Sequence, residues 1–188
     1  MNTKSLIINA GSSSLKFSLY EMPEKKELIN GNVEKIGLED SFVTLKLNGE
    51  KIKHKFVVKD HSDAAMVMIK ELIDNKVIEN INDINDIGHR ILHGGEFYAD
   101  SVVIDEEVLN NIVYLTKLGP LHHPGEIAVI KKMMELLPNT PNVAVFDTAF
   151  HQTMPKENFI YPVPYEWYTK YGVRKYGFHG TSHKYITG

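Results

Sequence analysis

Small polar residues separate two apolar stretches near the N-terminus, where residues 6–19 read LIINAGSSSLKFSL. An apolar run, a polar turn and then alternating apolar residues are typical of a β-hairpin with a polar tip. Such a tip offers backbone N–H groups, hydroxyls and the ammonium of Lys16, which are groups that bind phosphate chains. An ordinary turn is the alternative, because the segment has neither the Walker Gly-Lys-Ser/Thr nor the dinucleotide Gly-x-Gly-x-x-Gly pattern.

Seven of the nine histidines lie between His89 and His183. Isolated histidines are usually surface or hydrogen-bonded structural residues, which is one interpretation of this cluster. A metal site is another, since His179 and His183 would share a helical face, and His89 and His93 a strand face. No carboxylate or third histidine stands at a recognisable ligand spacing, and this speaks against a histidine-ligated metal.

Arg90 and Asp147 each lie at the end of an apolar stretch that reads as a strand. Beside Gly94 and Gly95, the guanidinium of Arg90 can project into a cleft and bind a carboxylate or phosphate with two N–H groups. A solvated surface arginine is the alternative. Asp147 follows a strand pattern at its carboxyl end, where α/β sheets usually place their sites. Its carboxylate could orient Arg90, hold a metal-bound water or act as a base, and the sequence leaves these roles open.

The elements that must position these residues alternate between strand and helix patterns. Strand patterns cover residues 4–9, 14–20, 28–36, 42–47, 52–58, 86–93 and 142–146, with the hairpin signal Asn48-Gly49 between two of them. Helix patterns begin at Asp63 (core face Ala65, Met68, Ile69, Leu72, Ile73), after the N-cap Asp105 (Val108, Ile112, Leu115) and at Pro124 (Ile127, Ile130, Met134, Leu137). Residues 154–171 read as an ordered surface loop. This order fits an α/β layered domain with a mixed sheet.

Composition limits the class of protein. The chain has 188 residues, 43% of them hydrophobic, which suffices for one core or a core with an inserted hairpin. A net charge of −3 gives no electrostatic reason to expect a nucleic acid or an anionic membrane as a partner. The absence of cysteine excludes disulfides and is compatible with a reducing cytoplasm. The N-terminal apolar run is too short for a signal peptide, so we expect a soluble, cytoplasmic protein.

Five blocks of the sequence resemble those of the acetate kinase family, in the family's order. They are the N-terminal segment above, GHRILHGGE (88–96), PLHHP (120–124), VFDTAFHQTMP (145–155) and VRKYGFHGTSHKY (173–185). The resemblance covers essentially the whole chain. It implies an α/β, ribonuclease-H-like (actin-like ATPase) domain, with a mixed sheet flanked by helices and an inserted β-hairpin. Family members are longer, so residues 1–188 would form the N-terminal domain of a two-domain kinase, on the acyl-substrate and phosphate side. The C-terminal nucleotide domain would lie outside this chain.

The resemblance also implies an activity. Acetate kinases transfer a phosphoryl group directly and reversibly between ATP and acetate, giving acetyl phosphate and ADP, and they require Mg²⁺ (or Mn²⁺). A homodimer is implied for the full-length protein, and the N-terminal half is expected to be inactive alone. The alternatives are a propionate or butyrate kinase of the same family, a non-catalytic truncated domain, and a metal hydrolase.

Site residues follow from the resemblance by position. The catalytic group of this half would be Arg90, Asp147 and His179, with His179 stabilising the transferring phosphoryl group. We favour orientation of Arg90 as the role of Asp147, because acetate is already ionised at neutral pH and needs no base. The resemblance assigns substrate binding to Arg90 and His122, a methyl pocket to Leu92, Leu121 and Phe178, the phosphate side to Ser12, Ser14, Lys16 and His179, and the approach to the metal to Asn9.

Two positions depart from the family pattern. His123 stands where the family commonly has Asn, which leaves the role of the pair that it forms with His122 open. Leu92 stands where the family usually has the smaller Val, so the pocket is either smaller or rearranged. Residues 179–184 resemble the family's interdomain helix.

Overall fold

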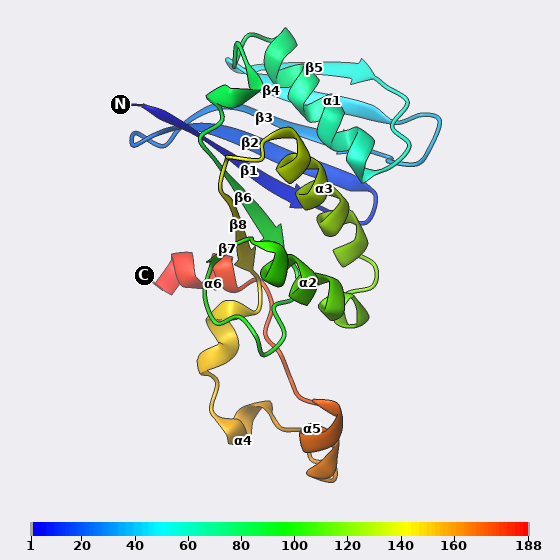
Figure 1. Ribbon diagram of the computed structural model, residues 1–188, viewed down its shortest axis with the longest axis vertical. Helices are drawn as coiled ribbons and strands as arrows, with labels where there is room; N and C mark the ends of the chain where they lie inside the picture. Colours follow the sequence, from blue (N-terminus) through cyan, green and yellow to red (C-terminus); the bar gives the residue numbers. More distant parts are fainter. Residues whose placement is uncertain (1, 188) are drawn as a thin grey trace.

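Eight strands form one mixed β-sheet in the computed structural model, which describes residues 2–187 (Figure 1). In spatial order the strands are β5 (Glu50–Lys55), β4 (Phe42–Leu47), β3 (Lys26–Glu34), β2 (Ser14–Met22), β1 (Thr3–Ala10), β6 (Asp86–Ile91), β8 (Asn142–Phe146) and β7 (Val102–Val103). The central strands β1, β6 and β8 are parallel, whereas the other neighbours pair antiparallel. The expected α/β fold with a mixed sheet is confirmed.

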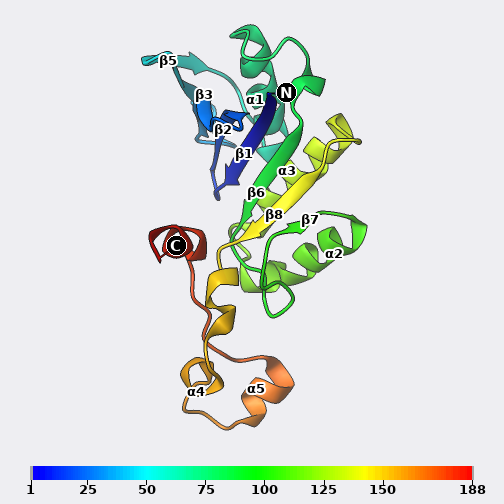
Figure 2. The ribbon, with the colours of Figure 1, turned by 90° about the vertical axis from the view of Figure 1, so that its left-hand side faces the viewer.

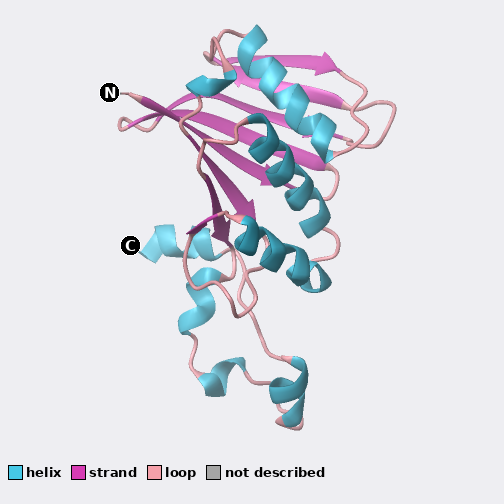
Figure 3. Cartoon of the chain, in the orientation of Figure 1, coloured by secondary structure: helices cyan, strands magenta, loops and turns pink. Residues whose placement is uncertain are grey.

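Alternation along the strands gives the sheet one apolar face. Leu6 pairs with Leu19 and Ile8 with Phe17, and all four side chains are buried. The three long helices, α1 (His61–Asp74), α2 (Glu106–Tyr114) and α3 (His123–Leu136), lie on this side of the sheet (Figure 3). Helix α3 packs against β1, β6 and β8, so it lies directly behind the strands that bear the candidate residues.

The opposite face of the N-terminal strands is polar. It contains a groove of about 700 Å³ whose lining includes Asn9, Lys16, Ser18, Asn30 and Asn32. Because Asn9 and Lys16 are register partners on β1 and β2, two candidate site residues share this face. The sheet thus separates the core, on the helix side, from the polar candidate residues.

The predicted hairpin insertion is confirmed as β4 and β5. Asn48 and Gly49 form the turn, and both have positive φ angles, 52° and 83°. Two positive φ angles are what a type I′ hairpin turn requires, and Asn-Gly is the dipeptide that adopts them at least cost. Strand β5 ends at Lys55, whereas the sequence pattern extended it to residue 58.

Helix starts are set by side-chain caps. Asp105 accepts a hydrogen bond from the N–H of Val108, which confirms it as the cap of α2. For α1 the cap is Asp60, which accepts from the N–H of Asp63, so the helix starts two residues before the predicted one. The prediction that Ile73 belongs to the core face of α1 is wrong, because this side chain is exposed.

The buried face of α3 differs from the predicted one. Pro124 does lie in the first turn, as predicted. However, Val129 and Met133 are fully buried, whereas Met134 is only partly buried. The reason is that α3 lies between two apolar clusters, one shared with α1 and one shared with α2. Side chains on a wide arc are therefore buried, which a single-stripe pattern does not anticipate.

The segment after β8 leaves the sheet as an arm (Figure 2). The prediction of a loop over residues 154–171 is wrong in part, because two short helices lie there, α4 (Lys156–Phe159) and α5 (Glu166–Tyr171). The chain then returns to the strand ends as α6 (Gly180–Thr187), on the other side from α2 (Figure 2). No helix within residues 2–187 is long and apolar enough to span a membrane.

Candidate active site

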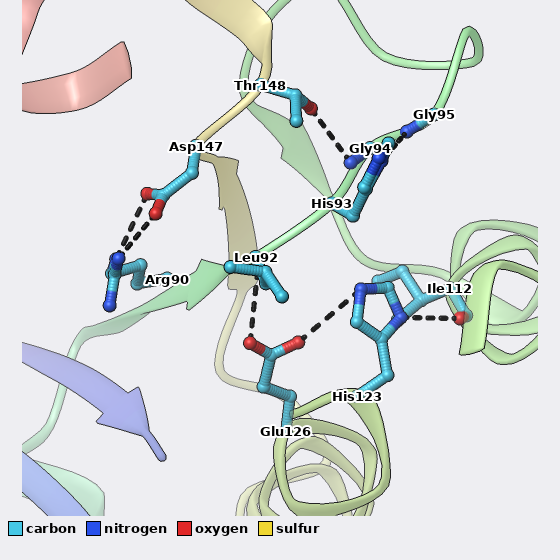
Figure 4. Close-up of polar contacts among 10 residues, drawn as sticks. All are labelled: Arg90, Leu92, His93, Gly94, Gly95, Ile112, His123, Glu126, Asp147 and Thr148. Carbon is cyan, nitrogen blue, oxygen red and sulfur yellow. Dashed lines mark hydrogen bonds and ion pairs between the residues drawn. The ribbon is translucent and has the colours of Figure 1, made fainter. Parts of the chain in front are cut away.

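An arginine–aspartate pair lies at the carboxyl ends of the parallel strands. Arg90 is near the end of β6, and Asp147 directly follows β8, its neighbour in the sheet. The Nε of Arg90 donates to Oδ1 of Asp147 at 3.0 Å, and an Nη donates to Oδ2 (Figure 4). The other Nη donates to Oδ1 of Asn9 at 3.1 Å, across the β1–β6 pairing. Three parallel strands thus contribute one residue each to this contact.

The pair is buried on one side only. The Asp147 side chain is 1% exposed and that of Arg90 is 38% exposed. A buried carboxylate is costly unless it is paired and hydrogen-bonded, and the two N–H groups of Arg90 meet this need. Because the Arg90 side chain is only partly covered, an incoming anion can still reach the guanidinium.

His179 is exposed and directly precedes Gly180, which contacts Asp147, so it does not lie on α6 as predicted. The helix begins at Gly180, whose N–H donates to the backbone oxygen of Asp147 at 2.8 Å. A Cβ at Gly180 would lie 2.5 Å from that oxygen, so this close approach requires glycine. His179 precedes it in the left-handed region, with φ 56°. The predicted helical pairing of His179 with His183 is therefore wrong, and the ring of His183 contacts His151 instead, at 3.2 Å.

The N-terminal turn closes tightly beside Arg90 and Asp147. The N–H of Gly11 donates to the backbone oxygen of Ser14, and Ser12 at the tip is exposed. Lys16 is exposed and pairs in register with Asn9, which itself pairs with Arg90. The structure therefore brings the predicted phosphate-side residues into the same region as Arg90 and Asp147.

Two of the predicted acyl-side residues, Leu92 and Phe178, lie at the segment after β6. Leu92 is half-buried there, and Phe178 packs its ring against that of His93 at 5.5 Å. Leu121 is 75% exposed, and His122 occupies the N-cap position of α3 without a side-chain capping bond. The methyl pocket assigned to Leu92, Leu121 and Phe178 remains a prediction.

Two of the clustered histidines are structural. The Nε2 of His89 is 2.8 Å from Oδ1 of Asn142, and the N–H of Gly95 donates to Nδ1 of His93. Burial lowers the pKa of both rings to about 4, which keeps them neutral at physiological pH. The interpretation as hydrogen-bonded structural histidines is thus confirmed for this pair. No group of three or more metal-ligating side chains occurs among residues 2–187.

Sequence reasoning missed Glu126. This carboxyl group is buried on α3, and its Oε1 accepts from the N–H of Leu92 at 3.0 Å (Figure 4). Its partner across the helix turn is His123, which the sequence marked only as a departure from the family pattern. A glutamate in an amphipathic pattern reads as a surface residue, so no local signal identified Glu126.

The described residues near Arg90 do not by themselves form a complete magnesium site. The carboxylate oxygens of Asp147 and the amide oxygen of Asn9 all face the guanidinium and accept its hydrogen bonds. Magnesium sites use free carboxylate oxygens together with water and substrate phosphates.

Comparison with known proteins agrees with this geometry. Residues 4–188 match the acetokinase family. The chain belongs to this family. The curated acetate kinases of Bacillus mycoides (strain KBAB4) and Geobacillus sp. (strain WCH70) are 56% and 54% identical to it over 185 residues, which are 98% of this chain. The chain spans about half the length of these relatives, 47%.

Solved structures show the same fold. The crystal structure of Porphyromonas gingivalis acetate kinase matches 98% of the chain with a TM-score of 0.93 and 43% identity. A propionate kinase from Francisella tularensis subsp. tularensis matches the same share with a TM-score of 0.90 and 38% identity. In both, the chain covers 47% of the other chain. The α/β fold predicted from the family resemblance is therefore confirmed.

Proposed function

We propose that the intact protein containing this chain is an acetate kinase, which transfers a phosphoryl group reversibly from ATP to acetate. The observation that supports this best is the pairing of Arg90 with Asp147 beside Asn9, at the carboxyl ends of three parallel strands. This arrangement presents a fixed cation to an anionic substrate, and the chain that carries it belongs to the acetokinase family.

Charge stabilisation is the main task of such a site. The transferring phosphoryl group spreads negative charge over its equatorial oxygens, and the acceptor is itself an anion. The free N–H groups of Arg90 would bind the acetate carboxylate or the phosphoryl oxygens, while Asp147 keeps the guanidinium plane in position. His179 would donate to the phosphoryl group, and His122 would hold the substrate. Asp147 need not act as a base, because acetate is ionised at neutral pH.

The parts of this proposal that concern the nucleotide and the metal rest on membership of the acetokinase family. We propose that Ser12, Ser14 and Lys16 face the phosphates of ATP, and that Mg²⁺ (or Mn²⁺) arrives with the nucleotide near Asn9. The metal would supply further neutralisation of phosphate charge, with its ligands completed by groups outside this chain. We further propose that residues 1–188 form the N-terminal domain of a cytoplasmic homodimer that binds neither nucleic acid nor membrane.

The second candidate function is a propionate kinase, which differs from an acetate kinase in the acyl chain length of its preferred substrate. A propionate kinase is among the similar structures, and the notable residue is Leu92 in the predicted pocket. One methylene changes binding by only about 1–3 kcal/mol, so related kinases differ in preference rather than in kind.

The test is acyl phosphate formation by the intact protein with Mg-ATP and acetate, propionate or butyrate. We expect the highest kcat/KM with acetate. Higher kcat/KM with propionate would assign the second candidate, and no acyl phosphate with any of the three acids would overturn the proposal.

The 188-residue chain alone should fold but not turn over. Its apolar faces are mutually buried, whereas the adenosine site and the closing domain would come from the rest of the protein. Without closure, water is not excluded and part of the electrostatic stabilisation is lost. The measurement is acetyl phosphate formation by the chain, with circular dichroism as the control for folding. A rate close to that of the intact protein would contradict this expectation.

A further inference from the structure

Two buried ionisable side chains face each other behind the predicted acyl side. His123 in the first turn of α3 is 0% exposed, and Glu126, one turn further on, is 4% exposed. Glu126 Oε1 accepts from the N–H of Leu92, and Nδ1 of His123 is 3.1 Å from the backbone oxygen of Ile112 on α2 (Figure 4). The pair therefore joins three elements: the segment after β6, α2 and the start of α3.

Hydrogen-bond partners define where the protons are. A backbone oxygen only accepts, so Nδ1 of His123 must carry the hydrogen that it donates to Ile112. In a neutral ring, Nε2 is then an acceptor. This Nε2 lies 3.9 Å from Oε2 of Glu126, and within residues 2–187 these two buried atoms have no other partner. At 3.9 Å they are too far apart for a direct hydrogen bond, so both atoms are left without one among the described residues, which is unusual for buried polar atoms.

Burial, more than the surrounding charges, favours the neutral form of this pair. Arg90 and Asp147 face Glu126 from the strand ends, but they are hydrogen-bonded to each other. The neighbouring rings that face His123 are His122 on its own helix and His93 on the segment after β6. Burial raises the pKa of Glu126 to about 8 and lowers the pKa of His123, so near neutral pH the carboxyl is protonated and the ring is neutral.

We propose that Glu126 and His123 act together as positioning residues for the acyl side of the site. The pair holds the main chain of Leu92, two residues after Arg90, and the turn that precedes His122. Packing supports this, because a Cβ at Gly119 would lie within 3.3 Å of both Leu92 and His123 side chains. The role rests on the proposed function, since it concerns the binding of the acid substrate.

Two variants of the intact protein test the pair. Glu126→Gln retains an acceptor for the N–H of Leu92 but cannot ionise, whereas Glu126→Leu removes this hydrogen bond at similar size. We expect Glu126→Leu to raise KM for acetate about tenfold with kcat changed less than about threefold, since a buried donor loses its partner. Glu126→Gln should rescue KM at pH 7. Wild-type KM should rise between pH 7 and 9, and Glu126→Gln should abolish this rise.

The matched control is Glu135→Gln, on the exposed side of the same helix, which should leave KM and its pH dependence unchanged. Histidine-labelled NMR gives a readout independent of turnover. The His123 ring should be neutral and protonated at Nδ1 at pH 7, in wild type and in Glu126→Gln. This measurement can be made even if Glu126→Leu does not fold.

Three results would overturn the proposed role of Glu126 and His123. They are an unchanged KM in Glu126→Leu, an alkaline rise that persists in Glu126→Gln, and a doubly protonated His123 ring at pH 7. If the wild-type protein makes no acyl phosphate, the proposed function fails instead, while NMR still shows whether the His123 ring is neutral and protonated at Nδ1.

Discussion

Asp147 and Glu126 are both buried carboxyl groups, yet their partners differ. Asp147 accepts two hydrogen bonds from a guanidinium that is always charged. Glu126 accepts one from the neutral N–H of Leu92, and its other oxygen faces an imidazole. They lie on opposite sides of the end of β6, as Figure 4 shows. Two similarly buried carboxyl groups of this site therefore have different surroundings, one with a charged donor and one with a neutral donor.

The difference also separates two tasks. The polar pair of Arg90 and Asp147 is partly open to solvent and can meet a substrate. The pair of Glu126 and His123 is closed and can act only through the groups that it holds. Substitutions at the two pairs should consequently change different kinetic constants.

The largest effect is expected from Arg90→Ala in the intact protein. Loss of a charge-stabilising donor typically costs about 3–4 kcal/mol of transition-state stabilisation, so kcat should fall about 10²- to 10³-fold. Arg90→Lys should rescue poorly, because an ammonium cannot replace a planar two-point donor. Steady-state acetyl phosphate formation measures both, with exposed Lys70→Ala as the control. Near-normal rates in either Arg90 variant would mean that this residue does not bind the substrate.

Asp147→Asn and Glu126→Gln form a matched comparison of carboxyl with amide. Asp147→Asn removes a charge-assisted partner of Arg90, and such bonds contribute about 1.5–3 kcal/mol, so we expect kcat/KM to fall about 10- to 100-fold. Glu126→Gln should change kcat/KM at pH 7 by less than about threefold. Equal losses of kcat/KM in the two variants would contradict the distinction between the charged pair of Arg90 and Asp147 and the neutral pair of Glu126 and His123.

Stability should depend on pH in two opposite ways. Histidines in the unfolded chain bind protons up to about pH 6.5, whereas folded His89 and His93, with a pKa of about 4, release theirs at lower pH. The free energy of unfolding therefore rises with pH between about pH 4 and 6.5. The folded Glu126 keeps its proton up to a pKa of about 8 and the unfolded one does not, so its contribution is lost as pH rises.

Above pH 6.5 only the second effect remains. The free energy of unfolding of the 188-residue chain should then fall by at most about 2 kcal/mol between pH 6.5 and 8, at roughly 1.4 kcal/mol per pH unit for one proton. In Glu126→Gln this decline should disappear. Urea denaturation at a series of pH values measures it, and an identical decline in the variant would contradict a raised pKa at Glu126.

The smallest effect concerns acyl chain length. Leu92→Ala in the intact protein should add room for a methylene and shift the ratio of kcat/KM for propionate over acetate upward by about 3- to 10-fold. The N–H of Leu92 still reaches Glu126 in this variant, so the pH dependence of KM should not change. An unchanged ratio would show that Leu92 does not line the pocket.

Local patterns in the sequence determined most of the elements. The predicted strand over 142–146 matches β8, Asp105 caps α2, and Asn48-Gly49 turns the inserted hairpin. These features depend on neighbours within a few residues, so side-chain alternation and capping chemistry suffice to predict them. The candidate roles of Arg90 and Asp147 were also accessible, because both residues follow apolar runs whose parallel pairing brings their ends together.

Only the tertiary structure decided the partners that are distant in sequence. The wide buried arc of α3 arises because this helix packs between two apolar clusters, and the two-residue strand β7 exists only by pairing with β8. Glu126 became a candidate because folding brings its carboxyl group to Leu92, which lies 34 residues earlier in the chain. The sequence determined which groups can ionise, and the fold determined which of them are buried and what each one faces, because desolvation and hydrogen bonding depend on the assembled surroundings.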